Sequence, residues 1–186
     1  MANRLSALAG HYSPGRFGAE GQAGVHLSVV ADLRLHQVAA WPDSLPAVGQ
    51  LLANSIGQAA KPGPGCAISS EQGAVLRIEP LKFWLLNLDP PTIEAEQGCS
   101  LDLSHSRTCV HIDGPQAQEF LGRLLPLDLR AAAFPDNRVA SSALHHVGVT
   151  LWHRGGGYDL FIPRGFAVSI WEVLHATALQ FGLEIS

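Results

Sequence analysis

One stretch in the middle of the chain limits the possible folds more than any other. Apolar and polar residues alternate from residue 108 to residue 113, the pattern of a strand with one buried face. Gly114-Pro115 then turns the chain, and proline suits the first turn of a helix because its missing N–H would be unpaired there. Apolar residues at helical spacing between Ala117 and Leu125 predict an amphipathic helix. The chain is therefore expected to run strand, turn, helix here.

A dense polar run leads into this strand. It holds Asp102, Ser104, His105 and Arg107, which include the residue types of a nucleophilic triad. A triad needs a set geometry, and in an extended chain Asp102 and Ser104 share one face while His105 points to the other. The G-x-S-x-G turn that exposes a catalytic serine is absent. We expect a hydrogen-bonded turn and no catalytic residue, with a Ser/His hydrolase built on Ser104 as an alternative.

The first half of the chain shows a strand, a helix and two more strands. Alternation predicts strands at residues 32–40 and 74–79, and an apolar run predicts a buried strand at residues 83–87. Apolar residues at helical spacing from Val48 to Ile56 predict a helix between them. Asp43 and Ser44 are suitable N-cap residues for this helix, and Gly57 suits its C′ position.

The second half repeats this order. Strands are predicted at residues 139–144, 147–153 and 158–162, with glycines 155–157 as a hairpin turn, and a final helix follows Arg164. The two halves, about residues 26–91 and 99–186, predict an α+β fold with a pseudo-repeat around antiparallel sheet in one domain of residues 26–186. Residues 1–25 are rich in Gly, Ser and Ala and are expected to form a flexible N-terminal arm.

Composition excludes several classes of partner. The net charge of −4 gives no basic footprint for nucleic acid, and no apolar run is long enough to cross a membrane. The apolar stretch near the N-terminus is too short for a signal peptide, so a cytoplasmic location is expected. Three cysteines without a C-x-x-C pair argue against a disulfide framework. Only 15% of residues are charged, against the usual quarter. This predicts either a surface covered by a partner protein or simply a Gly/Ala/Pro-rich sequence.

Metal and nucleotide sites are not indicated. His145, His146 and His153 form the densest histidine cluster but lack helical metal-ligand spacing. Glycines 155–157 lie in the predicted hairpin rather than between a strand and a helix, so they do not form a phosphate-binding loop. We therefore expect no metal-binding or cofactor-binding residue in this chain.

The polar run and the helix after it belong to an ordered set of motifs. The set is Asp102-Leu103-Ser104-His105, Arg107-Thr108, Ile112-Asp113-Gly114-Pro115, Ala117, Phe120-Leu121, Pro126-Leu127-Asp128-Leu129, Phe134-Pro135, Gly148-Val149, Leu151-Trp152, Asp159-Leu160, Pro163-Arg164 and Trp171. It resembles the folate-binding aminomethyltransferase fold, which includes the T-protein of the glycine cleavage system. It is more similar still to the gamma subunit of heterotetrameric sarcosine oxidase. In the first half, the segment ending in Phe83-Trp84-Leu85 resembles that subunit's Gly-Pro-x-x-Trp-Leu motif, with Glu79 where glycine is usual.

The resemblance implies a small, non-catalytic subunit of a flavoenzyme that demethylates sarcosine to glycine. With tetrahydrofolate, such a complex releases 5,10-methylenetetrahydrofolate and hydrogen peroxide. It implies alpha, beta and delta partner subunits that hold FAD, FMN, NAD and tetrahydrofolate, and none of these on this chain. Aminomethyltransferases carry an acidic pair in the strand that here spans residues 148–153 without an acid. A stand-alone folate-binding protein is the alternative.

The residues expected to fix the fold or to line a subunit contact follow from these motifs. They are Trp84, Asp102, Ser104, His105, Arg107, Gly114, Pro115 and Arg164.

Overall fold

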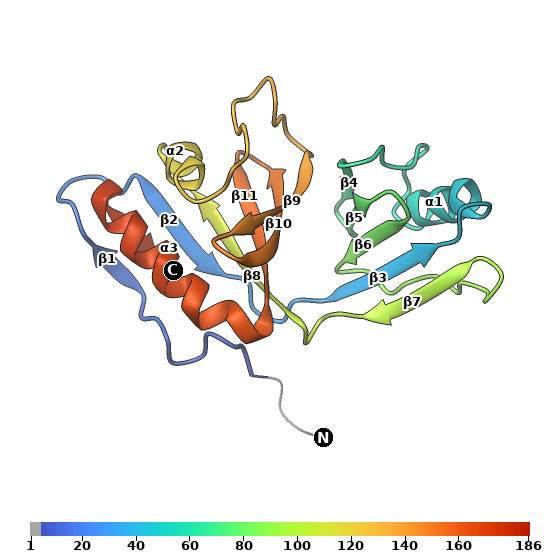
Figure 1. Cartoon of the computed structure of the whole chain (residues 1–186), viewed down its shortest axis with the longest axis horizontal. Coiled ribbons are helices and arrows are strands. Elements are labelled where there is room, and N and C mark those ends of the chain that lie inside the picture. Colours follow the sequence, from blue (N-terminus) through green and yellow to red (C-terminus); the bar gives the residue numbers. More distant parts are fainter. Residues whose placement is uncertain (1–4) are drawn as a thin grey trace. The chain divides into compact units, whose positions relative to one another are not determined.

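The computed structural model describes residues 5–186, which divide into two compact units (Figure 1). Unit 1 contains the residues up to Asp32, Ser106–Asp136 and Ser141–Ser186, and unit 2 contains Leu33–His105 and Asn137–Ala140. These units do not coincide with the two sequence halves expected at residues 26–91 and 99–186. The reason lies in the strand connections described below.

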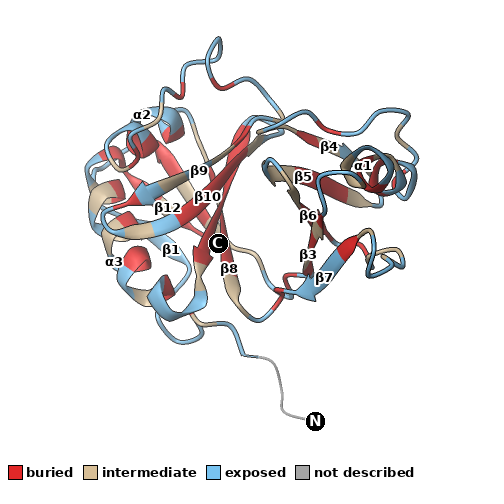
Figure 2. Ribbon diagram, turned by 45° about the vertical axis from the view of Figure 1, so that its right-hand side comes forward, coloured by how far each residue is buried: buried red, intermediate tan, exposed pale blue. Residues whose placement is uncertain are grey.

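Unit 2 is an antiparallel sheet with a helix on one face. Its elements are β3 (Leu35–Ala40), α1 (Leu45–Asn54), β4 (Ala67–Ser70), β5 (Gly73–Glu79), β6 (Lys82–Leu86) and β7 (Gly98–Asp102). The strands lie in the order β4-β5-β6-β3-β7, and each neighbouring pair is antiparallel. Val48 and Leu52 of α1 bury against a sheet face that includes Val38, Phe83 and Leu85. Figure 2 shows this buried face in red.

The end of α1 agrees with the sequence prediction. Gly57 has φ of +69°, and its N–H donates to the Asn54 carbonyl at 3.0 Å, while the Gln58 N–H donates to the Ala53 carbonyl at 3.0 Å. This is a Schellman motif with glycine at C′. Ser44 is the N-cap residue, but its hydroxyl donates to the carbonyls of Trp41 and Gln97 instead of capping a helix N–H.

Unit 1 is built on the other sheet of the described residues. Its elements are β1 (Gly15–Phe17), β2 (Val25–Val29), β8 (Arg107–Asp113), α2 (Ala117–Gly122), β9 (Val139–Leu144, whose first two residues belong to unit 2), β10 (Val147–Arg154), β11 (Gly157–Pro163), α3 (Ala167–Ala178) and β12 (Leu183–Ile185). The strands lie in the order β1-β12-β2-β8-β11-β10-β9. Strand β12 pairs parallel with β2, whereas β1–β12, β2–β8, β8–β11 and β10–β11 are antiparallel.

The pseudo-repeat is present in the strand order. In unit 2 a strand, a helix and three strands give the order β4-β5-β6-β3, and in unit 1 the same sequence gives β9-β10-β11-β8. Each set has one further strand at its end. In unit 2 this strand is β7, which lies beside β3 and precedes β8 in the chain. In unit 1 it is β2, which lies beside β8 and precedes β3 in the chain. The strand before each repeat therefore joins the sheet of the other repeat, which explains why the units are discontinuous in sequence.

The N-terminal segment differs from the flexible arm that the sequence suggests. Leu8 is fully buried, and β1 pairs with β12 near the other end of the chain. The Arg16 guanidinium lies 2.9 Å from the Glu184 carboxylate, and the Ala19 N–H donates to the Leu179 carbonyl. Residues 5–25 therefore pack as part of unit 1. The sequence pattern near them does not show this, because β12 and Leu179 lie at the other end of the chain. Residues 1–4 of the expected arm lie outside the described residues.

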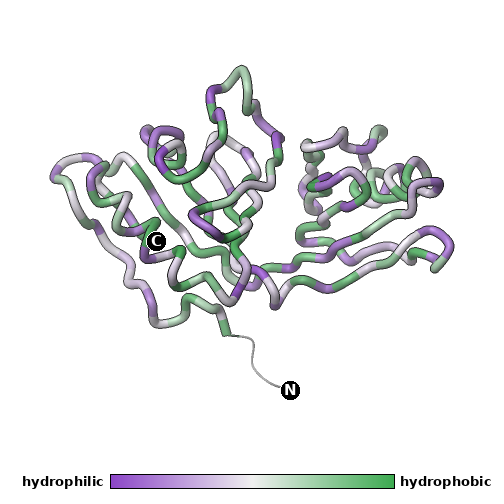
Figure 3. Tube along the Cα trace, in the orientation of Figure 1, coloured by the Kyte–Doolittle hydropathy of each residue, from purple (hydrophilic) through white to green (hydrophobic). Residues whose placement is uncertain are grey.

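Hydrophobic and hydrophilic residues are interspersed in both units, with no long uninterrupted hydrophobic stretch (Figure 3). Among residues 5–186, no helix has the length and apolar character needed to span a membrane.

Candidate functional site

The polar run at the end of β7 forms a hydrogen-bonded turn. The Ser104 N–H donates to Asp102 Oδ1 at 2.8 Å, and the Ser104 hydroxyl accepts from the Leu35 N–H at 2.9 Å. The same hydroxyl lies 3.3 Å from the Leu35 carbonyl, to which it can donate. Ser104 is also buried, and its hydroxyl contacts backbone groups, so it is not exposed as a catalytic nucleophile would be. The expected turn is therefore present.

Electrostatics favour an ionised Asp102 in this turn. The Ser104 side chain and backbone N–H are hydrogen-bonded to the carboxylate and hold the pKa of Asp102 below its usual value, with a smaller contribution from His36. His36 Nε2 lies 4.0 Å from Asp102 Oδ1. His105 is exposed and makes a small further contribution to the lowered pKa of Asp102. Together these contacts fix the end of β7 against β3.

Arg107 and Arg164 both bind the backbone at the start of β8 in unit 1. Arg107 Nη1 donates to the Ser106 carbonyl at 3.1 Å, and the Arg164 N–H donates to the same carbonyl at 3.0 Å. Arg164 Nη2 also donates to the Leu5 carbonyl at 2.8 Å. Burial lowers the pKa of the Arg107 guanidinium. The two arginines thus join the N-terminal segment, β8 and the start of η1 (Arg164–Phe166).

The Gly114-Pro115 turn is set by a close backbone approach. Gly114 has φ of +108°, and a Cβ at this position would lie 2.6 Å from the Gly24 carbonyl oxygen. A side chain is therefore excluded at position 114. Pro115 lies just before the Gln116 N-cap of α2, not in the first helical turn as the sequence suggests, and the helix ends at Gly122 instead of Leu125. The Gln116 N–H donates to the Gly24 carbonyl, which places the helix start.

Trp84 is a core residue of unit 2. Its side chain is 3% exposed, and Nε1 donates to Gln37 Oε1 at 3.3 Å across the β3–β6 pair. Of the other predicted residues, Asp102, Ser104 and His105 belong to unit 2, whereas Arg107, Gly114, Pro115 and Arg164 belong to unit 1. The set therefore forms local structural contacts within each unit instead of one constellation.

The histidines considered as metal ligands have separate surroundings. His145 takes φ of +53° in the turn between β9 and β10. The His153 ring stacks on Tyr158 with centroids 4.6 Å apart, and its Nδ1 lies 2.9 Å from the Phe134 carbonyl. Among residues 5–186, no group of three or more His, Cys, Asp or Glu side chains has metal-binding geometry.

A charge network on the sheet of unit 1 was not predicted. Asp159 is 2% exposed, and its carboxylate lies 2.6 Å from His111 Nδ1 and 2.8 Å from Arg154 Nε. His111 Nε2 lies 3.5 Å from Asp113, which in turn pairs with His26 at 2.7 Å. The hydrogen bond with Asp159 raises the pKa of His111 despite partial burial. The alternation in residues 108–113 shows that His111 and Asp113 share a face, but nothing local shows which residues lie opposite them.

The comparisons with known proteins agree with the motifs. The sarcosine oxidase subunit gamma of Arthrobacter sp. is 30% identical over 121 residues, which cover 64% of this chain and 60% of that subunit. The same subunit of Corynebacterium sp. strain U-96 is 31% identical over 99 residues, covering 49% of this chain and 48% of that subunit. The matched part thus spans about 60% or less of the relatives' length. No family model matches the chain.

Solved structures extend the likeness to the fold. A chain of the heterotetrameric sarcosine oxidase from Corynebacterium sp. U-96, in complex with pyrrole 2-carboxylate, matches with a TM-score of 0.75 and 26% identity, covering 89% of this chain and 88% of that chain. The glycine cleavage system aminomethyltransferase T from Bartonella henselae matches with a TM-score of 0.58 and 16% identity, covering 88% of this chain and 48% of the other. This second likeness shows a shared fold. In sequence the chain is similar to sarcosine oxidase gamma subunits, and in fold it is similar to a chain of the heterotetrameric sarcosine oxidase, so the predicted resemblance and α+β fold are confirmed.

Proposed function

We propose that this chain is the gamma subunit of a heterotetrameric sarcosine oxidase-like flavoenzyme. The observation that carries the proposal is the agreement of two comparisons, one in sequence with gamma subunits and one in fold with a chain of the heterotetramer. The low charged fraction of 15% supports it, because interface cores are depleted in charge. Its partners would be the alpha, beta and delta subunits.

The role that we propose within the complex is structural. The polar groups that could have formed an active site are used for local contacts, since Ser104 binds the Leu35 backbone and Arg107 binds the Ser106 carbonyl. FAD, FMN, NAD and tetrahydrofolate would be held by the other subunits. The complex would oxidise sarcosine to glycine and transfer the methyl carbon to tetrahydrofolate, with hydrogen peroxide as the reduced product of oxygen. The three free cysteines suit a cytoplasmic complex.

The alternative of a stand-alone folate-binding protein has less support. The likeness to aminomethyltransferase T is at 16% identity and concerns the fold. In β10, where aminomethyltransferases carry an acidic pair, the buried polar position is Thr150 and no carboxylate is present. Thermal unfolding of the isolated chain with tetrahydrofolate separates the two functions. We expect no shift in Tm, and a saturable increase would favour the alternative.

Co-expression tests the main proposal. The chain, carrying an affinity tag, is expressed with the candidate flavoprotein subunits of the same organism, and the eluate is assayed for flavin absorbance and for sarcosine-dependent hydrogen peroxide. We expect the flavoprotein subunits to co-purify with the chain in fixed proportion. Recovery of the tagged chain without them would overturn the proposal.

The predicted contact residues lead to a narrower expectation. Arg107 is half-buried and positions the start of β8, and we propose that this segment contributes to a subunit contact. Arg107→Ala should lower the amount of co-purified flavoprotein while leaving the Tm of the isolated chain within a few degrees of the wild type. Unchanged recovery of the complex with Arg107→Ala would show that Arg107 has no role in the subunit contact and only positions the start of β8.

A further inference from the structure

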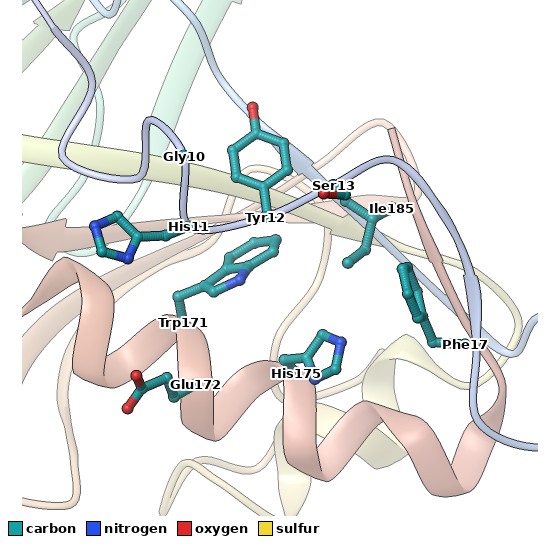
Figure 4. Close-up of a pocket in the computed structure, with 9 residues that line it drawn as sticks. All are labelled: Gly10, His11, Tyr12, Ser13, Phe17, Trp171, Glu172, His175 and Ile185. Atoms are coloured by element: carbon teal, nitrogen blue, oxygen red, sulfur yellow. The ribbon is translucent and has the colours of Figure 1, made fainter.

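A groove on unit 1 lies between the N-terminal segment and helix α3 (Figure 4). It has a volume of about 520 Å³. Residues 10–13 and Phe17 form one wall, α3 forms the other, and Ile185 of β12 lies between them. A volume of several hundred Å³ is in the range that holds a bulky ligand group or the anchor side chain of a partner.

One part of the groove is aromatic. Tyr12 packs on Trp171 with ring centroids 5.3 Å apart, and Phe17 meets the His175 ring edge-on at 5.5 Å. Trp171 is 3% exposed and belongs to the core, whereas Phe17 is 36% exposed on an edge strand. The Phe17 ring therefore offers the groove an apolar edge against which a partner side chain can pack.

The other end of the groove is polar and carries a negative charge. Figure 4 shows Glu172 and His11 on the side of Trp171 away from Phe17. Glu172 is exposed and makes no salt bridge among the described residues, whereas Glu119 and Glu184 each pair with an arginine. An unpaired carboxylate next to aromatic rings favours a cationic side chain, because the ion pair and the ring faces both attract it.

We propose that this groove receives a partner-subunit segment that presents a bulky apolar side chain next to an arginine or lysine. The apolar side chain lies against Tyr12, Phe17 and Ile185, and the basic group pairs with Glu172. The inference rests on the proposed function, since it names the surface through which the chain joins its complex. It assigns no ligand or chemistry to the chain.

Charge reversal and truncation in the groove test this surface in the full complex. The Kd of the tagged chain for the flavoprotein subunits is measured for Glu172→Lys and Phe17→Ser. The matched control is Glu71→Lys, which reverses an exposed carboxylate in the turn between β4 and β5 of unit 2. Each groove variant is expected to raise Kd by about tenfold or more, the size of an interface hot spot, and the control should not change it.

A milder variant guards against a folding defect. Phe17→Ser removes the ring contact with His175, so Glu172→Gln gives a second reading that keeps the shape of the side chain. The wild-type complex should weaken as salt is added, because the Glu172 pair lies at the rim and is screened. The Glu172→Gln complex should start weaker and respond less to salt. An equal salt response of the two complexes would contradict the proposed ion pair.

A photo-crosslinker identifies the occupant. With p-benzoylphenylalanine in place of His11, the cross-linked segment should come from a partner subunit and contain a basic residue beside a bulky apolar one. A cross-link to a second copy of this chain would overturn the inference. So would unchanged Kd values for Glu172→Lys and Phe17→Ser in a complex that the wild type forms, and the proposed function would then stand. Failure of the wild type to assemble would overturn both.

Discussion

Ser104 shows how a residue of catalytic type can serve structure. Its hydroxyl satisfies both the N–H and the carbonyl of Leu35, which joins the end of β7 to the start of β3. A buried serine whose hydroxyl is engaged with the backbone in this way is held in place as part of the turn. The residue type was readable from the sequence, but the partner that decides its role lies 69 positions away.

Replacing this serine should therefore affect stability. Ser104→Ala leaves a buried Leu35 N–H without its partner, and we expect a loss of about 1–3 kcal/mol in the free energy of unfolding. Ser100→Ala, at an exposed position of β7, is the matched control and should change stability little. Urea unfolding of the isolated chain measures both. Equal stability of Ser104→Ala and the wild type would show that the hydroxyl is not structural.

The pKa of His111 makes a pH-dependent prediction. Its ordinary value is 6.5, and the hydrogen bond with Asp159 raises it in the folded chain. The contribution of protonated His111 should be complete below about pH 6.5 and should be lost as pH rises through the higher folded value. The charged groups that face His111 are Asp159 and Asp113, and Arg154 lies against Asp159.

The comparison variant for this prediction is His111→Gln. The stability difference between the wild type and His111→Gln, measured by urea unfolding from pH 5.5 to 9, should be largest at the acid end and should shrink as pH rises. A difference that is constant or grows with pH would show that the His111–Asp159 pair does not titrate as described.

At the scale of elements, long periodic segments were predicted well and short edge strands were not. The alternation in residues 108–113 and the helical spacing around Trp171 correspond to β8 and α3. In contrast, β1 and β12 have three residues each and show no period, and β7 is exposed on four of its five residues. Such strands exist because a partner from a distant part of the chain supplies their hydrogen bonds, and a local pattern does not carry that information.

The N-terminal segment gives a test at this scale. Leu8 is fully buried although the sequence around it suggests an arm, so Leu8→Ala should cost about 2–5 kcal/mol of unfolding free energy, the range for a buried leucine. Leu5→Ala, at a side chain that is 67% exposed, should cost far less. Thermal unfolding of the two variants checks the expectation. Equal Tm values would mean that the segment does not pack on unit 1.

The candidate site illustrates the same limit. The sequence indicated the turn at Asp102 and Ser104 and the turn at Gly114-Pro115. It did not indicate the network of Asp159, His111 and Arg154, because that network depends on the register of β8, β10 and β11. The sequence did not indicate the groove between the N-terminal segment and α3 either, since its two walls come from opposite ends of the chain.

At the scale of the whole chain, the repeat and the exchanged strands are the central feature. Each repeat obtains a strand from the segment before the other repeat, so neither sheet is complete without both halves of the sequence. The chain shares its fold with aminomethyltransferase T. In this chain Ser104 and Arg107 bind backbone groups and so hold strands and turns in place. We propose on this basis that the chain acts through association with other subunits.

Native mass spectrometry of the co-expressed, affinity-purified complex tests this claim most directly. The account predicts an assembly of four different subunits that contains one copy of this chain and oxidises sarcosine with release of hydrogen peroxide. A chain that appears at its own mass, or bound to copies of itself alone, while the flavoprotein subunits assemble without it would contradict the account.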